Sequence, residues 1–226
     1  MGFLKRFFHN VLRDGSEPME RNGFDRLPRV ELESHLTVAR YGEFWLTEAI
    51  RPSVDLAIVP QEGYRHSRYD DPKGGSMPVL MGSVTREKLF ETFLDLLDPL
   101  GPVVDVVLET SHTRHARGSE ELYREQIDLP VLKSRLYDHE DLLLNDGCTG
   151  IAVLNPDVPM EVQFDEHKLL LVYAQNLRTF ETVFQEHAVR RNERMRFITE
   201  AEHLHSSRAR HVDSFQSLQQ TLGMDV

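Results

Sequence analysis

The sequence contains a single cysteine, Cys148, among 226 residues. One thiol excludes an internal disulfide framework and any zinc site made of cysteines alone. The chain also lacks an apolar run near the roughly 20 residues that a membrane-spanning helix needs. Because the basic start is not followed by the apolar segment of a signal peptide, we expect a cytoplasmic protein.

Motifs that identify common catalytic classes are absent as well. The sequence has no Gly-x-Gly-x-x-Gly, no Walker lysine, no Gly-x-Ser-x-Gly and no His-Glu-x-x-His. No internal repeat is visible either. We therefore expect no bound cofactor, and we favour a protein that is not an enzyme.

Acidic residues outnumber basic ones, and the formal net charge is -11. Nucleic-acid binding depends on neutralising phosphates and releasing their counterions, which an acidic body opposes. We therefore expect no nucleic-acid partner. The negative charge could attract a basic partner, or it could simply keep the protein soluble.

Length and composition indicate one folded domain with appendages. At 226 residues and 40% hydrophobic content, the chain can bury a substantial core. We predict an amphipathic segment and linker over 1–26, an α+β domain over 27–188 and a helical tail over 189–226.

The block over 141–188 organises this domain. Residues 142–144, a turn at Asn145-Asp146-Gly147 and residues 151–154 predict a hairpin. Strands at 160–164 and 169–173 follow, and apolar residues then recur at helical spacing up to Ala188. The pattern predicts an antiparallel meander at 141–174 with a helix returning over it.

Upstream, the pattern predicts a strand–helix–strand crossover over 77–109. It consists of a strand at 77–81, a helix that begins after Thr85 and a buried strand at 103–108. The fold class is therefore α+β, with a mixed, mostly antiparallel sheet and helices mainly on one face. Elsewhere we expect a helix over 32–50 or a strand at 34–40, a strand at 54–59, a loop over 61–76, polar connecting sequence up to 128 and a short helix over 129–139.

Both ends of the chain carry amphipathic segments. Phe3, Phe7 and Phe8 share one side of an expected helix with a basic flank, which suits either a membrane surface or the protein's own domain. Helical spacing continues from 177 to about 204 and then resumes. The resumed stripe either packs on the body or is offered to a protein partner or a second copy of the chain. It consists of Val212, Phe215, Leu218 and Leu222.

A cationic loop follows the strand that ends at Glu109. It carries His112, Arg114, His115 and Arg117, and ligands gather beyond the carboxyl ends of parallel strands. The loop is therefore a candidate binding site for an anionic group, with a solvated loop as the alternative. His112 and His115 have no third ligand at metal-site spacing, so we expect no metal there.

A polar strand face offers a second candidate site. Glu161, Gln163, Asp165 and His167 alternate with apolar residues, and carboxylates beside a histidine can do acid–base work or bind a cation. A solvated sheet face explains the same pattern, but we keep Asp165 and His167 as binding candidates. Cys148 has acidic neighbours in sequence, which disfavour the thiolate that a nucleophile needs.

The segment His35-Leu36-Thr37 resembles one half of the signature of 2H phosphoesterases. In that family two His-x-Thr/Ser elements on strands face one phosphodiester, with one histidine as base and the other as acid. The second half is not matched here, because His112-Thr113-Arg114 has its threonine one place early and His205-Ser206-Ser207 falls in the expected helical tail. One histidine cannot perform both proton transfers.

Three functions follow as hypotheses. The first is a non-catalytic binding or protein-interaction module, because the C-terminal stripe has no local partner and no catalytic constellation is complete. The second is an enzyme acting on a phosphate-bearing or other anionic small substrate, which requires the loops at 65–73 and 112–117 to converge on one pocket. The third is a peripheral membrane adaptor that uses the N-terminal aromatic residues.

Overall fold

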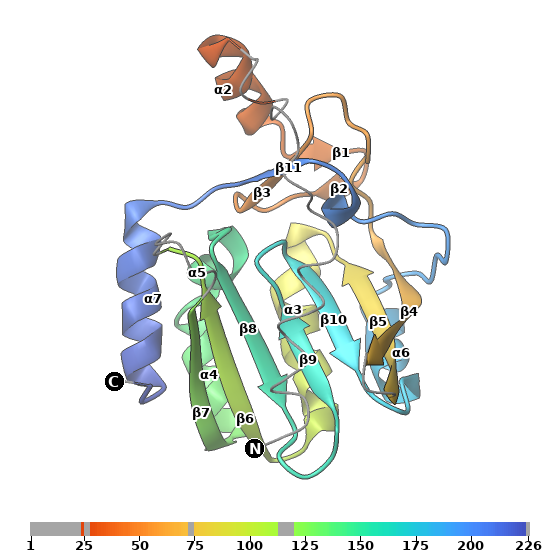
Figure 1. Ribbon diagram of the computed structural model, residues 1–226, viewed down its shortest axis with the longest axis vertical. Coiled ribbons are helices and arrows are strands. Elements are labelled where there is room, and N and C mark those ends of the chain that lie inside the picture. The colour runs from red at the N-terminus through yellow and green to blue at the C-terminus, as the bar shows by residue number, and fades with distance from the viewer. Residues whose placement is uncertain (1–23, 25–27, 72–74, 113–119, 225–226) are drawn as a thin grey trace.

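The computed structural model describes residues 24, 28–71, 75–112 and 120–224. Its centre is a seven-stranded sheet in the order β4-β5-β10-β9-β8-β6-β7 (Figure 1). Every neighbouring pair in this sheet is antiparallel. The strands in this order are β4 (Gly63–Asp71), β5 (Gly75–Ser83), β10 (Leu169–Tyr173), β9 (Glu161–Phe164), β8 (Thr149–Leu154), β6 (Val103–Thr110) and β7 (Glu120–Asp128).

The expected α+β class is confirmed, and so is the crossover over 77–109. β5 and β6 run in the same direction, and the helix between them carries the chain across the three strands that separate them. The strand at 103–108 is nevertheless antiparallel to both of its neighbours. Among the described residues, the parallel contact is a single bridge between Tyr64 and Arg191, so the ladders of the sheet are not mixed.

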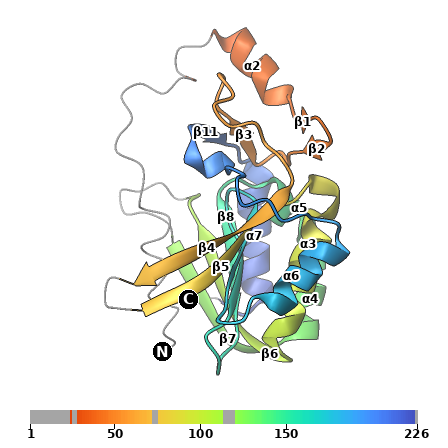
Figure 2. The same ribbon diagram turned by 90° about the vertical axis from the view of Figure 1, so that its right-hand side faces the viewer.

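Helices cover mainly one face of the sheet, as expected (Figure 2). Their apolar sides form the main core with the strands, and the rings of Phe93 and Phe164 lie with their centroids 5.2 Å apart. Burying one such side chain stabilises the fold by roughly 1.5–3 kcal/mol. The helices are α3 (Arg86–Leu97), α4 (Leu129–Tyr137), α5 (Glu140–Asn145) and α6 (Arg178–Glu186), with α7 (Ala209–Thr221) beside β7 and against α4 and α5.

The meander is confirmed from β8 to β10, but its expected first strand is wrong. Residues 142–144 lie in α5, where Leu142, Leu143 and Leu144 are buried in the main core. A short apolar run fits a buried strand and a buried helix equally, because it has no period to tell them apart. The turn that follows therefore ends a helix and is not a hairpin.

Two polar strands were not predicted. β4 lies where a loop over 61–76 was expected and pairs with β5, which contains the predicted strand at 77–81. β7 lies in the expected polar connection before 128. Both β4 and β7 are edge strands, which natural sheets protect with charged side chains rather than with apolar ones. The expected strand at 54–59 is wrong, since this segment forms turns and bends.

A small lobe stands above the end of the sheet (Figure 1). The predicted helix over 32–50 is confirmed only up to Thr37, where α2 ends and short strands follow, and the alternative strand at 34–40 is wrong. The last of these strands pairs with a strand from the far end of the sequence. The lobe contains α2 (Arg29–Thr37), β1 (Arg40–Tyr41), β2 (Phe44–Trp45) and β3 (Ile50–Pro52), and the distant strand is β11 (His203–His205).

The segment between α6 and α7 is extended, so the predicted continuation of helix to about 204 is wrong. It contains only a short 3-10 turn, Ile198–Glu200, before β11. Met195 and Phe197 from this segment cover the second face of the sheet, where they meet Leu171 and Tyr173. The apolar residues that suggested a helix serve this contact instead.

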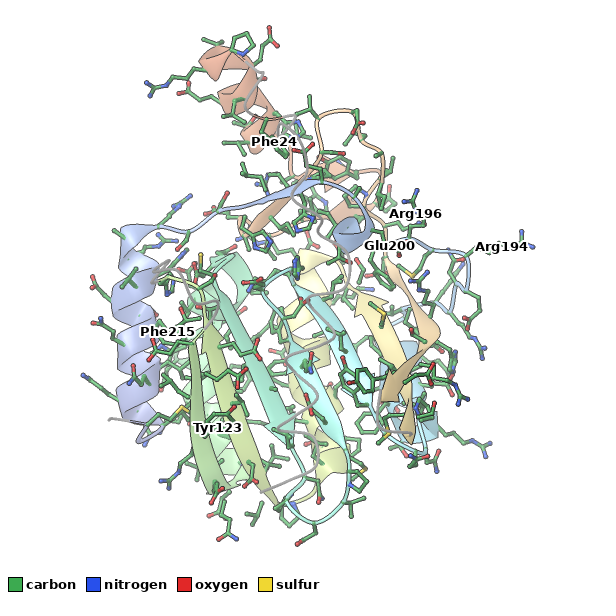
Figure 3. The ribbon with its side chains drawn as sticks, viewed as in Figure 1. Phe24, Tyr123, Arg194, Arg196, Glu200 and Phe215 are labelled. Atoms are coloured by element: carbon green, nitrogen blue, oxygen red, sulfur yellow. The ribbon has the colours of Figure 1, made fainter. Side chains whose placement is uncertain are left out.

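The C-terminal helix packs on the body of the protein. Phe215, Leu218 and Leu222 are buried in the main core, whereas Val212 is 37% exposed. Figure 3 shows Phe215 on the side of α7 that faces the sheet. A protein partner or self-association through the C-terminal helix stays a prediction. The N-terminal aromatic residues lie outside the described residues, and no described helix is both long and apolar enough to cross a membrane.

A carboxylic acid is buried on the second face of the sheet. Glu161 pairs with Tyr173 in the ladder and is 1% exposed. The Gln163 side-chain amide donates a hydrogen bond to Glu161 Oε1 at 2.6 Å. Burial raises the pKa of Glu161 to about 8, to which the negative charge of Glu109 contributes.

We expect Glu161→Gln to stabilise the protein, and to do so more strongly at higher pH. The pKa of Glu161 in the folded protein is about 8, above its ordinary value of 4.5, so the native state retains a proton that the unfolded chain releases. The resulting destabilisation grows with pH across this range by up to roughly 1.4 kcal/mol per pH unit. Urea unfolding at about pH 5 and about pH 8 measures it.

The matched control is Glu186→Gln, which makes the same chemical change at an exposed position of α6. A gain in unfolding free energy that is equal at both pH values, or that the control reproduces, would contradict this account of Glu161.

Candidate metal centre

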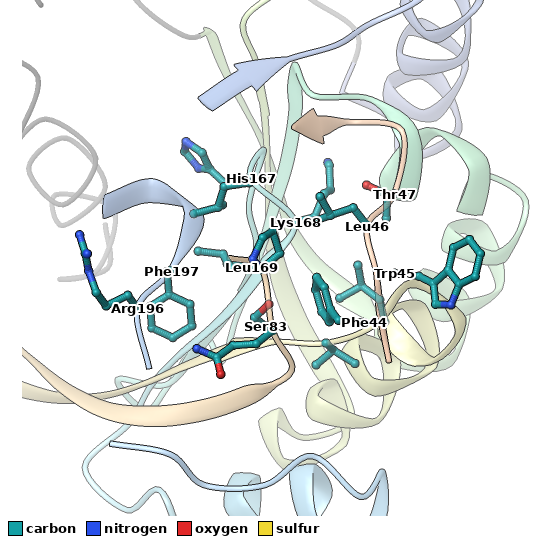
Figure 4. A pocket seen from close by; sticks show the side chains of 15 residues that line it. Phe44, Trp45, Leu46, Thr47, Ser83, His167, Lys168, Leu169, Arg196 and Phe197 are labelled. Carbon is teal, nitrogen blue, oxygen red and sulfur yellow. The ribbon is translucent and has the colours of Figure 1, made fainter. Parts of the chain in front are cut away.

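Three histidines meet at the end of the sheet beneath the small lobe. One ring nitrogen of each of His167, His203 and His205 lies within 4.8 Å of those of the other two. Their ring centroids are 4.7 to 5.1 Å apart. His167 belongs to the turn between β9 and β10, and Figure 4 shows it close to β11, which carries the other two.

The two histidines of β11 share one face because the strand is extended. Side chains two residues apart in a strand point the same way, so His203 and His205 both face the turn that carries His167. Pairing with β3 fixes this strand, since His203 lies opposite Pro52 and His205 opposite Ile50. The orientation of the pair is therefore set by backbone hydrogen bonds.

The turn that carries His167 is also held firmly. Asp165 Oδ1 accepts a hydrogen bond from the backbone N–H of Leu169 at 2.8 Å, and the N–H of Lys168 donates to the Asp165 carbonyl at 3.0 Å. Lys168 adopts a left-handed backbone conformation with φ of 61° to close the turn. His167 is thereby directed toward β11.

Each of the three imidazoles donates from Nδ1 to a separate acceptor. His167 Nδ1 bonds Asp165 Oδ2 at 2.9 Å, His203 Nδ1 bonds the carbonyl of Ala201 at 2.8 Å and His205 Nδ1 bonds the carbonyl of Gly147 at 2.7 Å. Carbonyl and carboxylate oxygens only accept hydrogen bonds, so Nδ1 carries the proton. In the neutral form of each ring, Nε2 is then left with its lone pair, which is the arrangement that metal-binding histidines show.

The electrostatic surroundings favour neutral rings on β11. Burial lowers the pKa of His205 to about 4, and the neighbouring His167 lowers it further. Burial likewise lowers the pKa of His203. Burial alone would lower the pKa of His167 too, but the Asp165 carboxylate outweighs it and the pKa is raised.

A buried lysine compensates the charge of Asp165. Lys168 is 5% exposed, and its Nζ donates to the carbonyl of Thr149 at 2.9 Å. Burial lowers its pKa to about 8, while the carboxylates of Asp165 and Asp146 favour its charged form. The lysine therefore anchors the turn from below, on the side away from β11 (Figure 4).

His112 belongs to a separate buried ion pair. Its Nε2 lies 2.9 Å from Asp146 Oδ2, and its Nδ1 lies 2.8 Å from the hydroxyl of Thr110. Asp146 is fully buried; burial alone would raise its pKa, but hydrogen bonds from His112, Ser207 and Thr149 outweigh burial and lower it to about 2. Both ring nitrogens of His112 face these partners, and one of them also lies within 4.8 Å of the Cys148 thiol.

The structure brings some of the predicted site residues together and separates others. Asp165 and His167 belong to the three-histidine centre, whereas His112 lies in the neighbouring ion pair. Arg114, His115 and Arg117 lie outside the described residues. Of the two cationic segments that an anion pocket required, the described residues Arg65 on the edge strand β4 and His112 after β6 are five strand spacings or roughly 24 Å apart in the sheet. Convergence of the rest of these segments stays a prediction.

His203 and His205 were missed because their segment was predicted as helix. The signal was present as His-x-His, which places both imidazoles on one side of a strand but on different sides of a helix. The 2H phosphoesterase resemblance is not supported, since His35 lies in α2 and its Nε2 contacts the carbonyl of Pro52 at 2.9 Å. His205, expected in a helix, lies in a strand.

Comparisons with known protein families, with curated proteins and with solved structures find no match for this chain.

Gly147 is the point where the centre touches the small lobe. A Cβ atom there would lie 2.4 Å from the Ala49 carbonyl oxygen and 2.9 Å from the backbone nitrogen of Ser206. Contacts this short require backbone to move, so we expect Gly147→Ala to lower the unfolding free energy by roughly 1–3 kcal/mol. Urea unfolding of the variant measures this loss.

Gly150→Ala is the matched control, because the nearest atoms to its Cβ would lie at an ordinary 3.6 Å. Equal losses in the two variants would show that crowding at Gly147 is not the cause.

Proposed function

We propose that this protein binds a divalent transition-metal ion, Zn²⁺ in the first place, through Nε2 of His167, His203 and His205. The observation that supports it is the separate acceptor on each Nδ1, which leaves three Nε2 lone pairs on rings whose nitrogens lie within 4.8 Å of one another. Contact between Asp165 and His167 also matches the carboxylate–histidine pairs that support metal ligands.

The ligand chemistry favours zinc over the hard cations. Imidazole nitrogen suits Zn²⁺, Cu²⁺ and Ni²⁺, whereas Mg²⁺ and Ca²⁺ prefer oxygen ligands. A tetrahedral Zn²⁺ site has Zn–N distances near 2.1 Å and so brings its nitrogens to about 3.4 Å from one another. Modest rotation of the three rings reaches that spacing. Three protein ligands leave a fourth position for water or a small ligand.

Metal binding would join two parts of the fold. His167 comes from the large sheet, whereas His203 and His205 come from a strand that pairs with β3 of the small lobe. An ion held by all three stabilises the native state by mass action, because the unfolded chain offers no assembled site. This is a binding role, and it requires no catalytic group.

Zn²⁺ should bind with one ion per chain, and His203→Ala and His205→Ala should each weaken it on the order of 100-fold or more, since each removes a ligand. Asp165→Asn keeps all three ligands but removes the carboxylate behind His167, so we expect a loss of about 10- to 100-fold. Competition with a chromophoric chelator measures these affinities.

His187→Gln is the control, because His187 pairs with Asp95 away from the centre and its Nε2 lies 2.7 Å from that carboxylate. Zn²⁺ affinity that is unchanged in the β11 variants, or that falls equally in the control, would reject the site. A thermal shift on adding Zn²⁺ to the wild type, absent in His205→Ala, provides an independent readout.

A further inference from the structure

A second candidate site lies beside residues 206–208, which follow β11. A cleft of about 470 Å³ opens between the small lobe, the first turn of α3 and the chain leading into α7. Three arginines reach it from three different elements: Arg51 from β3, Arg86 from α3 and Arg208 from the start of α7.

Arg51 is a buried cation whose hydrogen bonds go to neutral groups. It is 6% exposed, and its Nε donates to the carbonyl of Leu36 at 2.9 Å. Its Nη1 donates to the carbonyls of Ile50 at 2.7 Å and Thr47 at 2.5 Å. Among the described residues, no carboxylate lies within ion-pair distance of its guanidinium group. Burial lowers the pKa of Arg51; Tyr41 and the carboxylate of Glu48 oppose this effect, and the positive charge of Arg86 adds to it.

The other charges of the cleft leave an excess of positive charge. Arg86 is exposed and forms no ion pair with any described carboxylate. Arg208 pairs with Glu48, with Nη2 and Oε2 2.6 Å apart. Three arginines and one glutamate give the lining a charge of +2, in a protein whose net charge is -11. Positive charges gathered around one cleft attract an anion of similar magnitude and opposite sign.

We propose that this cleft binds a small molecule through a phosphate group held by Arg51, Arg86 and Arg208. A phosphate monoester carries a charge of roughly -1.5 to -2 at neutral pH, which matches the lining better than the single charge of a carboxylate. Guanidinium groups can pair with phosphate oxygens in a bidentate geometry. Arg51, whose Nε and Nη1 donate to carbonyls, would contribute through Nη2 alone. Ser206 also lines the cleft, and Leu36 and Leu46 provide an apolar wall for the body of the ligand.

The size of the cleft and the charge of the protein restrict the ligand to a small molecule. The volume lies within the range of roughly 300–1,000 Å³ that small-molecule pockets occupy. A nucleic-acid strand would bring many phosphates near an acidic body, which opposes its binding. This proposal uses no metal ligand and does not depend on the metal centre.

Titration with inorganic phosphate at low ionic strength, followed by calorimetry, tests the site. We expect saturable binding of one phosphate per chain with a Kd near the millimolar range, and binding of acetate at least about tenfold weaker. Arg86→Gln should weaken phosphate binding about tenfold, because it removes one charged hydrogen-bond donor. Glu48→Gln should strengthen it, because the variant removes the carboxylate that competes for Arg208.

Arg178→Gln is the control, since it makes the same charge change at an exposed position at the start of α6. The two test positions are at the surface of the cleft, and circular dichroism shows whether each variant is folded. Equal weakening in Arg86→Gln and Arg178→Gln, no tightening in Glu48→Gln, or no saturable binding by the wild type would overturn the proposal.

The same titration with His205→Ala in a chelating buffer separates this site from the metal centre. Phosphate affinity within about twofold of the wild type supports an independent anion site. Loss of phosphate binding together with the metal would show that the anion binds at the metal, and would reject the arginine site.

Discussion

Three stretches of backbone meet at Gly147, and this junction holds the two halves of the molecule together. The Gly147 N–H donates to the Ser206 carbonyl and the Ser206 N–H donates to the Ala49 carbonyl, both at 2.8 Å, while the Gly147 carbonyl accepts from His205 Nδ1. No side chain fits at this position. The close approach fixes the positions of the small lobe, β11 and the end of α5 relative to one another. Both proposed sites lie next to this junction.

The two sites use the segment over 203–208 differently. Its first part is a paired strand, so its histidines are rigidly presented to the turn between β9 and β10. Its second part passes Ser206 and Arg208 along the cleft before α7 begins. The proposed cation site and the proposed anion site thus lie on one continuous piece of backbone.

The sequence predicted the elements whose burial gives a clear period. The strands β6, β8 and β10, the crossover and the helices α3, α6 and α7 were all predicted, because one or both of their faces are apolar. The edge strands β4 and β7 were missed because they are polar and so show no apolar period. Asp165 and His167 were found as candidates, but their partners on β11 depend on pairing with β3, a contact that no local pattern encodes.

The pairing of β3 with β11 also determines the order in which this protein can be completed. Residues 50–52 have no strand partner until residues 203–205 arrive, so the small lobe joins the sheet only after nearly the whole chain has collapsed. Contacts between such distant segments are slow to form, because a long loop must close first. During synthesis all strands of the sheet emerge before β11 does, so the histidine cluster can form only after them, and α7 is the one described helix or strand that follows it.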